Sequence, residues 1–307
     1  MNRMSALFVF ALLNAVALGG DPLSEDVCCA AIGDLDGLEV GDKRALGELA
    51  AFEPMKKPGP GDWLAVHAEA GQTYQEFVEA KLPQPSSSRD KLYIQPLGAY
   101  SREAPGLEVL SLFCSTFFDV EVVVLASVEV DSSRIQSREN PYTGDLQLLS
   151  TDILKFLRTE KAEDAFAVIA VTLVDLYPHD EWNFVFGQAN YYSGVGVFSF
   201  ARYGDDPKKV LSRSLKVMTH EFGHMYGVKH CIHFQCLMNG SNSLSETDRQ
   251  PQHLCPVCLR KIQASTGTQL LERYVKLKSF YELQQMEAEA IFVKKRIDLM
   301  ISIEESE

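Results

Sequence analysis

The sequence HEFGHMYGVKH, residues 220–230, is the part of the chain that decides the expected fold and chemistry. On a helix, His220 and His224 stand four residues apart, so both imidazoles leave the same face about one turn apart. That spacing suits two ligands of one tetrahedral zinc ion, each at roughly 2.0–2.1 Å from the metal. Gly227 permits a tight turn after the helix, and His230 can then return to the metal as a third ligand. Three histidine ligands leave a fourth position open, which is typical of a catalytic zinc site.

Glu221 lies between the two helical histidines, at a position that suits a general base. Its side chain projects about 100° away from that of His220, so it does not join the same ligand face. It can instead reach a water at the open position of the metal and take its proton. The preceding residues, among them Val210, Leu215 and Met218, have helix-like apolar spacing, which places the motif on a helix. The pattern predicts a zinc hydrolase, against the alternative of a chance match in an ordinary helix.

Four cysteines follow this motif in two closely spaced pairs. Cys231 and Cys236 form a C-x4-C pair, and Cys255 and Cys258 form a C-x2-C pair. Two such pairs separated by a loop are typical of a closed structural zinc site with four thiolates and no position for water. The alternatives are two disulfides, or buried thiols that only pack. We therefore predict two zinc ions per chain, one catalytic and one structural, coupled mechanically because His230 and Cys231 are adjacent.

The remaining histidines and cysteines carry weaker signals. His233 and His253 flank the cysteines and could replace one of them as a ligand, but with four cysteines available we expect both to be polar loop residues. Nothing in the spacing of His179 gives it a place in the site. Cys114 lies in an apolar stretch and is expected in the core. The adjacent pair at positions 28 and 29 is expected to be incidental thiols near a mobile terminus.

A methionine between the cysteine pairs strengthens the assignment. Met238 lies in a tight turn just after the third histidine, and in metzincin peptidases such a methionine turn forms a hydrophobic floor under the zinc ligands. Together, residues 220–230, the four cysteines and Met238 resemble the archaemetzincin family. The similarity extends upstream to three further segments and covers most of the span from about residue 63 to residue 274. The upstream segments are residues 175–178, 181–188 and 194–202.

The resemblance implies more than the residue spacing does. Archaemetzincins resemble metzincins around the catalytic zinc and add a four-cysteine zinc beside it. The family is associated with peptidase or aminopeptidase-like activity, so the implied substrate is a peptide or a protein. The alternative function is a catalytically silent binding module, stabilised by zinc, that keeps the fold without using Glu221.

Composition narrows the possible partners. The chain has 307 residues, of which 46% are hydrophobic, enough for a substantial core. Its 42 acidic and 29 basic residues give a formal net charge of −13, with an isoelectric point near 5.1. An acidic chain without a long run of Lys and Arg does not favour a nucleic-acid partner.

The N-terminal stretch bears on localisation. Arg3 precedes an apolar run over residues 6–18, and Gly19 and Gly20 follow it. This is the pattern of a secretory signal peptide and is too short for a comfortable membrane span; an ordinary N-terminal helix is the alternative. The pattern favours secretion, whereas the family resemblance favours a cytoplasmic protein. No other run is long and apolar enough to cross a bilayer.

Apolar periodicity along the chain predicts alternating strands and helices, and therefore an α/β fold. We expect a metzincin-like catalytic domain with a twisted, mixed but mostly parallel sheet, an active-site helix, and a C-terminal zinc–cysteine subdomain with a helical tail. Residues 194–202 are expected either at the sheet edge beside the cleft or as a core strand with glycines for close packing. The expected strands are 91–95, 120–130, 165–174, 184–188 and 194–202. The expected helices are 43–52, 74–81, 107–118, 146–159 and 269–285, with one more through residue 301.

The same patterns suggest a division of the chain into four parts. Residues 1–20 are expected to be the signal peptide, and residues 21–90 an N-terminal extension that ends in a linker rich in Pro and Ser. Residues 91–265 would form the catalytic domain, and residues 266–307 the helical tail.

Overall fold

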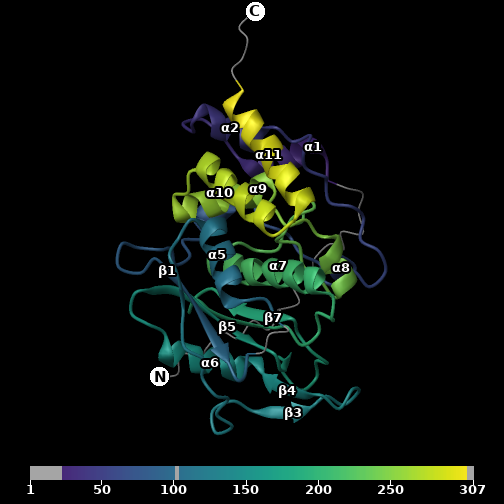
Figure 1. Ribbon diagram of the computed structural model, residues 1–307. Coiled ribbons are helices and arrows are strands. Elements are labelled where there is room, and N and C mark those ends of the chain that lie inside the picture. Colours follow the sequence, from purple (N-terminus) through teal and green to yellow (C-terminus); the bar gives the residue numbers. More distant parts are fainter. Residues whose placement is uncertain (1–22, 101–103, 303–307) are drawn as a thin grey trace, which may run out of the picture.

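The computed structural model describes residues 23–100 and 104–302 (Figure 1). The signal-like stretch over residues 1–20 and the acidic last residues lie outside this range. Within it, no helix has both the length and the apolar character needed to cross a membrane.

A five-stranded, mostly parallel sheet forms the centre of the molecule. β5 is apolar from Ala165 to Val171 and buried along its whole length, as expected for a strand covered on both faces. All neighbouring strands run parallel except β7, which pairs antiparallel with β8. The order across the sheet is β2 (Val122–Val124), β1 (Lys91–Leu97), β5 (Ala165–Thr172), β8 (Val195–Ser199) and β7 (Gly187–Asn190).

Helices cover both faces of this sheet and create two separate cores. Alternate β5 residues point to opposite sides: Ile169 and Val171 belong to one cluster, and Val168 and Ala170 to the other. Helix α6 (Ser150–Glu160) packs on the second side, whereas α5 (Leu107–Phe118) and α7 (Pro207–Met225) lie on the first (Figure 1). A small sheet of β3 (Ser137–Glu139), β4 (Leu146–Leu149) and β6 (Asp175–Tyr177) flanks α6.

A third layer of helices lies above α5 and α7 and combines both ends of the described chain (Figure 1). From the C-terminal part come α9 (Pro256–Thr266), α10 (Leu270–Leu283) and α11 (Glu287–Ile301), and from the N-terminal part α1 (Glu25–Ile32), α2 (Val40–Gly47) and α4 (Tyr74–Glu79). α8 (Leu244–Arg249) lies beside α7 (Figure 1), and α3 (Trp63–Val66) is hydrogen-bonded to α8. α1, α2 and α4 contact α9, and α2 also contacts α11.

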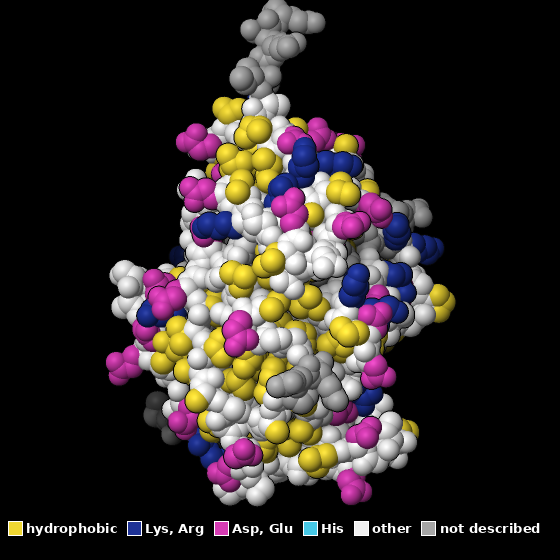
Figure 2. All heavy atoms as spheres, in the orientation of Figure 1, with side chains coloured by type: hydrophobic (Ala, Val, Ile, Leu, Met, Phe, Trp, Pro, Cys, Tyr) yellow, Lys and Arg dark blue, Asp and Glu magenta, His cyan; other side chains and the backbone are white. Residues whose placement is uncertain are grey.

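The surface carries acidic, basic and hydrophobic side chains. Figure 2 shows acidic and basic side chains interspersed on the face turned toward the viewer, with hydrophobic side chains gathered near its middle. This agrees with the absence of long runs of one charge sign in the sequence.

The α/β fold class and the mostly parallel sheet are confirmed, but several element boundaries differ from the sequence-based expectation. The strand expected over residues 120–130 is reduced to β2, and residues 146–149 form a strand before α6 instead of its first turn. The helix expected over residues 43–52 is α2, which ends at Gly47. Of the two alternatives for residues 194–202, the core strand is correct and the edge strand is wrong, because β8 lies between β5 and β7. The edge is β7, which overlaps the strand expected over residues 184–188 only at its first two residues, because its sequence GQAN is short and polar.

Candidate metal centres

Helix α7 carries the first two candidate zinc ligands, and its sequence explains where it begins and ends. Asp206 caps the N-terminus, since its carboxylate accepts hydrogen bonds from the backbone N–H groups of Lys208 and Lys209 at 3.0 and 3.4 Å. Pro207 occupies the first turn, where its missing N–H costs no helical hydrogen bond. The helix stops before Gly227, whose φ of +88° turns the chain back toward the helix.

The structure brings His220, His224 and His230 together. One ring nitrogen from each lies within 4.8 Å of the others, and all three side chains are only half-buried. The Nε2 atoms of His220 and His224 are 3.0 Å apart; ligands of a tetrahedral zinc ion would be separated by about 3.4 Å. The donor set and its spacing therefore fit zinc.

Hydrogen bonds orient the two helical histidines for this role. The Nδ1–H of His220 donates to the carbonyl oxygen of Leu237 at 2.9 Å, and that of His224 donates to Val228 at 2.7 Å. These bonds leave Nε2 of each ring as the free nitrogen, as a metal ligand requires. Burial, with His230 nearby, lowers the pKa of His220 to about 3, so its imidazole is neutral.

His230 is oriented by a contact that the sequence patterns do not reveal. Its Nδ1 lies 2.7 Å from Oε1 of Glu69, and the same oxygen accepts a hydrogen bond from the Trp63 indole Nε1 at 2.9 Å. The Trp63 ring meets His230 edge-to-face, with 5.0 Å between the ring centroids. Glu69 and Trp63 lie in a weakly periodic region more than 150 residues before the motif, where no residue spacing marks them.

Glu221 lies beside the histidines and against the sheet edge. Its side chain is 8% exposed, and among the described residues no hydrogen bond or ion pair engages its carboxylate. A methyl group placed on Gly187 of β7 would lie 2.7 Å from its Oε1 atom, so the glycine leaves room for the carboxylate. Burial raises the pKa of Glu221 to about 8, and a divalent cation held nearby would favour its charged form.

The four predicted cysteine ligands also converge, in a fully buried cluster. Their sulfur atoms lie within 4.8 Å of one another, and Sγ of Cys231 is 3.6 Å from Sγ of Cys255. This is far longer than a disulfide bond of about 2.05 Å, and close to the separation of about 3.8 Å between thiolates on one tetrahedral zinc. The backbone N–H groups of Met238 and Cys255 point at Sγ of Cys236, at 3.4 and 3.2 Å. The described cysteines are all free, and this cluster fits a zinc ion.

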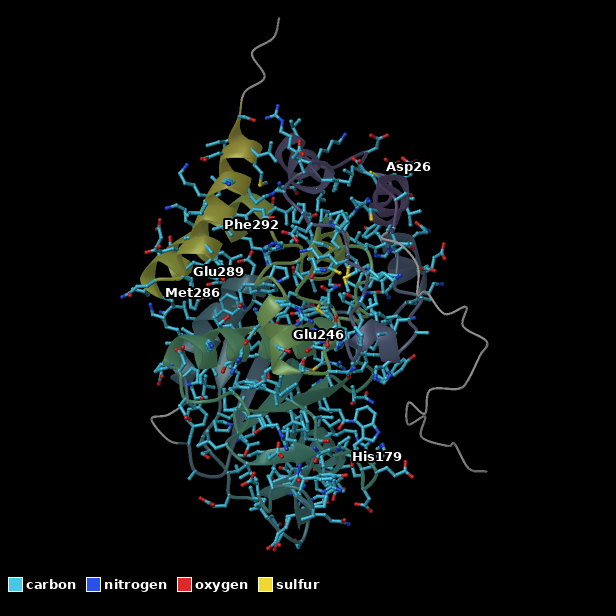
Figure 3. The ribbon with its side chains drawn as sticks, turned by 90° about the vertical axis from the view of Figure 1, so that its right-hand side faces the viewer. Asp26, His179, Glu246, Met286, Glu289 and Phe292 are labelled. Atoms are coloured by element: carbon cyan, nitrogen blue, oxygen red, sulfur yellow. The ribbon has the colours of Figure 1, made fainter. Side chains whose placement is uncertain are left out.

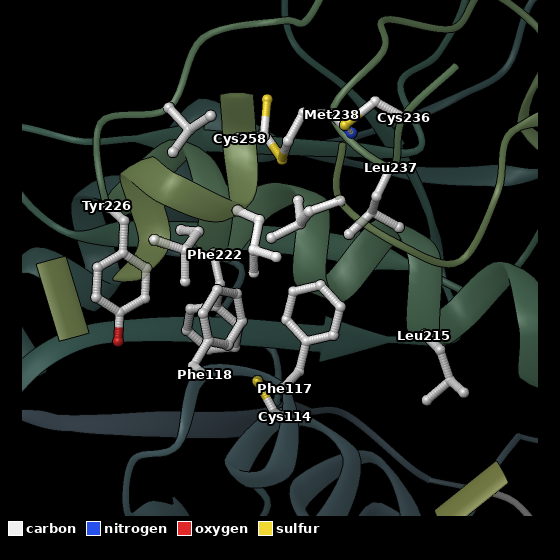
Figure 4. Close-up of a cluster of buried hydrophobic side chains, with 14 of the residues drawn as sticks. Cys114, Phe117, Phe118, Leu215, Phe222, Tyr226, Cys236, Leu237, Met238 and Cys258 are labelled. Carbon is white, nitrogen blue, oxygen red and sulfur yellow. Dashed lines mark hydrogen bonds between the residues drawn. The ribbon is translucent and has the colours of Figure 1, made fainter. Parts of the chain in front are cut away.

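Met238 lies between the two clusters and packs under α7. A methyl group on Gly223 would lie 2.6 Å from the sulfur of Met238, so the helix and the turn meet closely at that glycine. Figure 4 shows Met238 and Leu237 on the same side of α7 as Cys236 and Cys258, with Phe117 and Phe118 of α5 across the helix. The Asn239 side chain fixes the turn by donating to the carbonyl oxygens of Cys231 and Phe234 at 2.8 and 2.9 Å. The Met238 turn thus supports both clusters at once.

The other histidines lie outside both ligand groups. His233 lies in a loop, as expected, but is buried near the cysteines, and its Nδ1 has no hydrogen-bond partner in the described part of the chain. His253 stacks on Phe292 with 3.8 Å between ring centroids. His179 is exposed. It lies in the lower part of the view in Figure 3, away from Glu246 of α8.

The three remaining cysteines differ from one another. Cys114 is fully buried in the core, as expected. Cys29 is exposed, but Cys28 is 2% exposed and its thiol donates to the carbonyl oxygen of His233 at 3.4 Å. The expectation that Cys28 is an incidental thiol near a mobile terminus is therefore wrong, because α1 packs its apolar face on the core beside the cysteine cluster.

Known proteins resemble this chain over most of its length. The model of peptidase family M54 matches residues 122–264. Archaemetzincin-2 from Macaca fascicularis and from Homo sapiens are each 38% identical to the chain, in a match that covers 77% of the chain and 78% of the relative.

Solved structures also match. The archaemetzincin of Archaeoglobus fulgidus, crystallised with malonate, has 32% identity and a TM-score of 0.46; the match covers 56% of this chain and 99% of that one. The archaemetzincin of Methanopyrus kandleri has 30% identity and a TM-score of 0.49, with 60% and 99% covered.

Proposed function

Since this chain belongs to the archaemetzincins and is a zinc metallopeptidase, we propose that Glu221 is its general base and that His220, His224 and His230 hold the catalytic zinc. The observation that carries this proposal is the convergence of three oriented imidazoles beside a buried carboxylate that has no other described partner. Zinc bound by these histidines would polarise the scissile carbonyl and lower the pKa of water.

The chain's own residues supply the proton transfers. Glu221 takes a proton from the attacking water and then delivers it to the leaving amine. Burial raises its pKa, and a zinc ion held by the neighbouring histidines would favour the ionised form that accepts the proton. Gly187 provides the space in which this carboxylate lies.

A peptide or protein substrate fits the edge of the sheet. β7 is the outer strand next to β8, and its first residue, Gly187, touches Glu221. An extended peptide paired with β7 would therefore pass close to the proposed base, with its backbone held by hydrogen bonds to the strand. We propose aminopeptidase action, on the strength of the family resemblance.

The cysteine cluster is proposed to hold a second, structural zinc. Its four sulfurs are buried, close together and free of disulfides, so no coordination position would remain for water. The chain would then bind two zinc ions of unequal lability, with the half-buried histidine site losing its metal to a chelator first.

Glu221→Gln tests the catalytic role directly. Gln has nearly the same shape but cannot accept the proton, so we expect hydrolysis to fall at least about 100-fold while the zinc content is unchanged. Cleavage of a peptide library is read by mass spectrometry, using peptides with free and with acetylated N-termini. Loss of cleavage on acetylation supports aminopeptidase action.

Two outcomes would contradict the proposal. Retention of most activity by Glu221→Gln would remove this residue from its role as base. Failure of the fully zinc-loaded parent to cleave any peptide would favour a catalytically silent, zinc-stabilised binding module.

A further inference from the structure

Residues 63–82, which we name the N-terminal clamp, wrap around the loop that carries the third candidate ligand. Gln72 is 3% exposed and holds this loop on both sides of residue 228. Its amide Nε2 donates to the carbonyl oxygen of Gly227 at 3.3 Å, and its Oε1 accepts from the backbone N–H of Lys229 at 3.1 Å. Leu82 packs against Gly227, where a methyl group would lie 2.6 Å from its side chain.

The clamp touches the proposed metal site itself through Glu69. Oε1 of Glu69 lies 2.7 Å from Nδ1 of His230. A carboxylate that accepts this proton fixes the tautomer of the ring and aims Nε2 at the metal. The other oxygen of Glu69, Oε2, is buried and has no hydrogen-bond partner among the described residues. Burying a carboxylate in this way is unfavourable by itself, which indicates that its place beside His230 serves more than packing.

Trp63 connects the N-terminal clamp to α8 and to Gly240, which follows the Met238 turn. Its indole N–H donates to Glu69, and its backbone N–H donates to Oε1 of Glu246 on α8 at 2.8 Å. Its ring also lies on Gly240, where any larger residue would collide with it, since a methyl group would come within 2.3 Å. Glu69 is thus held by a ring that α8 and the end of the Met238 turn keep in place.

We propose that the N-terminal clamp completes the catalytic metal site, and that Glu69 is a positioning residue that sets the zinc affinity of His230. The inference rests on the proposed role of His230 as a ligand. The clamp precedes the span 122–264 that the family model matches, so it adds to the ligand motif an element from another part of the chain.

Zinc affinity is the readout that tests this proposal. The parent, Glu69→Ala and Glu69→Gln are titrated with zinc against a chromophoric chelator. We expect Glu69→Ala to weaken the more labile of the two sites about 10- to 100-fold and to leave the tighter site unchanged. Glu69→Gln should recover part of the loss, because its amide oxygen still accepts from Nδ1–H. Glu79→Ala, which alters an exposed carboxylate of the same segment, is the matched control and should match the parent.

Two further measurements separate positioning from folding. Trp63→Phe keeps an aromatic ring on Gly240 but removes the N–H that holds Glu69, so we expect a smaller loss of affinity at the same site. The visible spectrum of the Co²⁺-substituted protein should change for Glu69→Ala and Glu69→Gln, because the ligand field at His230 changes. If Glu69→Ala does not fold, the two conservative variants still decide the matter.

Parental zinc affinity and an unchanged Co²⁺ spectrum in the Glu69 variants would overturn the proposal, even if their activity falls. Its failure is distinct from failure of the proposed function. If Glu221→Gln is as active as the parent but Glu69→Ala loses zinc, the proposal for Glu69 is supported and the assignment of Glu221 as the base fails. If Glu221→Gln is inactive but the Glu69 variants bind zinc like the parent, only the proposal for Glu69 is rejected.

Discussion

The histidine cluster and the cysteine cluster meet at two adjacent residues, His230 and Cys231, yet they differ in almost every physical respect. The three histidines are half-buried, whereas the four cysteines are buried. The histidine rings are held from outside, by backbone carbonyls and by Glu69. The thiol of Cys236 is instead approached by backbone N–H groups of its own loop and of the helix start at Cys255. The contrast teaches that one peptide bond separates a half-buried group of potential ligands from a fully buried one, and we propose that the first serves catalysis and the second the fold.

Cys255→Ser is expected to have the largest effect, and it tests whether the cysteine cluster stabilises the fold. If the buried cluster organises the fold through zinc, losing one ligand should lower the free energy of unfolding by several kcal/mol, toward a limit on the order of 10 kcal/mol. Activity should fall as well, because the Met238 turn and the loop with His230 lose their support. Urea denaturation and a peptidase assay measure the two effects. A variant that unfolds like the parent and still cleaves peptide would show that the cysteines are not a structural zinc site.

His224→Ala should give the opposite pattern. We expect the zinc content to fall from two ions per chain to one, and activity to fall at least about 1,000-fold, because the open site loses a ligand and with it the metal. The free energy of unfolding should change by only about 1–2 kcal/mol, since the side chain is half-buried. Elemental analysis, the peptidase assay and urea denaturation check this. Loss of both zinc ions would mean that the two sites are not separable.

Gly187→Ala is the mildest of these changes. It acts within the histidine cluster and its surroundings, where it separates the position of Glu221 from the binding of zinc. The added methyl group would lie 2.7 Å from Oε1 of Glu221 and must displace this carboxylate. We expect kcat to fall about 10- to 100-fold, as for other small misplacements of catalytic groups. Zinc content and the free energy of unfolding should match those of the parent. An unchanged kcat would show that the observed position of Glu221 does not matter for the reaction.

The sequence reveals the two ligand groups because their members are close together along the chain. His220, His224 and His230 span a single helix and turn, and the cysteine pairs have spacings that metal geometry requires. Their convergence therefore follows from local structure. Glu69 was missed because its contact with His230 joins residues 161 positions apart, and no periodicity in its segment indicates where that segment packs.

The same holds for the fold: elements with a strong pattern along the chain were predicted, whereas pairing between segments was not. The long apolar strand β5 and the amphipathic helix α5 were predicted well, since each presents a strong pattern over many residues. The sequence left open whether residues 194–202 lie at the edge of the sheet, because the true edge strand, β7, is only four residues long and polar. Its pairing with β8 depends on the turn between them, where Gly194 adopts a φ of +61°, and not on hydrophobic periodicity.

The packing of α2 against α11 has a consequence for how the chain matures on the ribosome. Gly41 of α2 lies against Met300, and Arg296 of α11 reaches the carbonyl oxygen of Ala45. Synthesis delivers α11 about 250 residues after α2, so the buried residues of α2 have no α11 to pack against until this intervening stretch has been translated. Contacts of such long sequence separation form slowly. During synthesis there is therefore a long interval in which the helical layer beside the cysteine cluster still lacks α11.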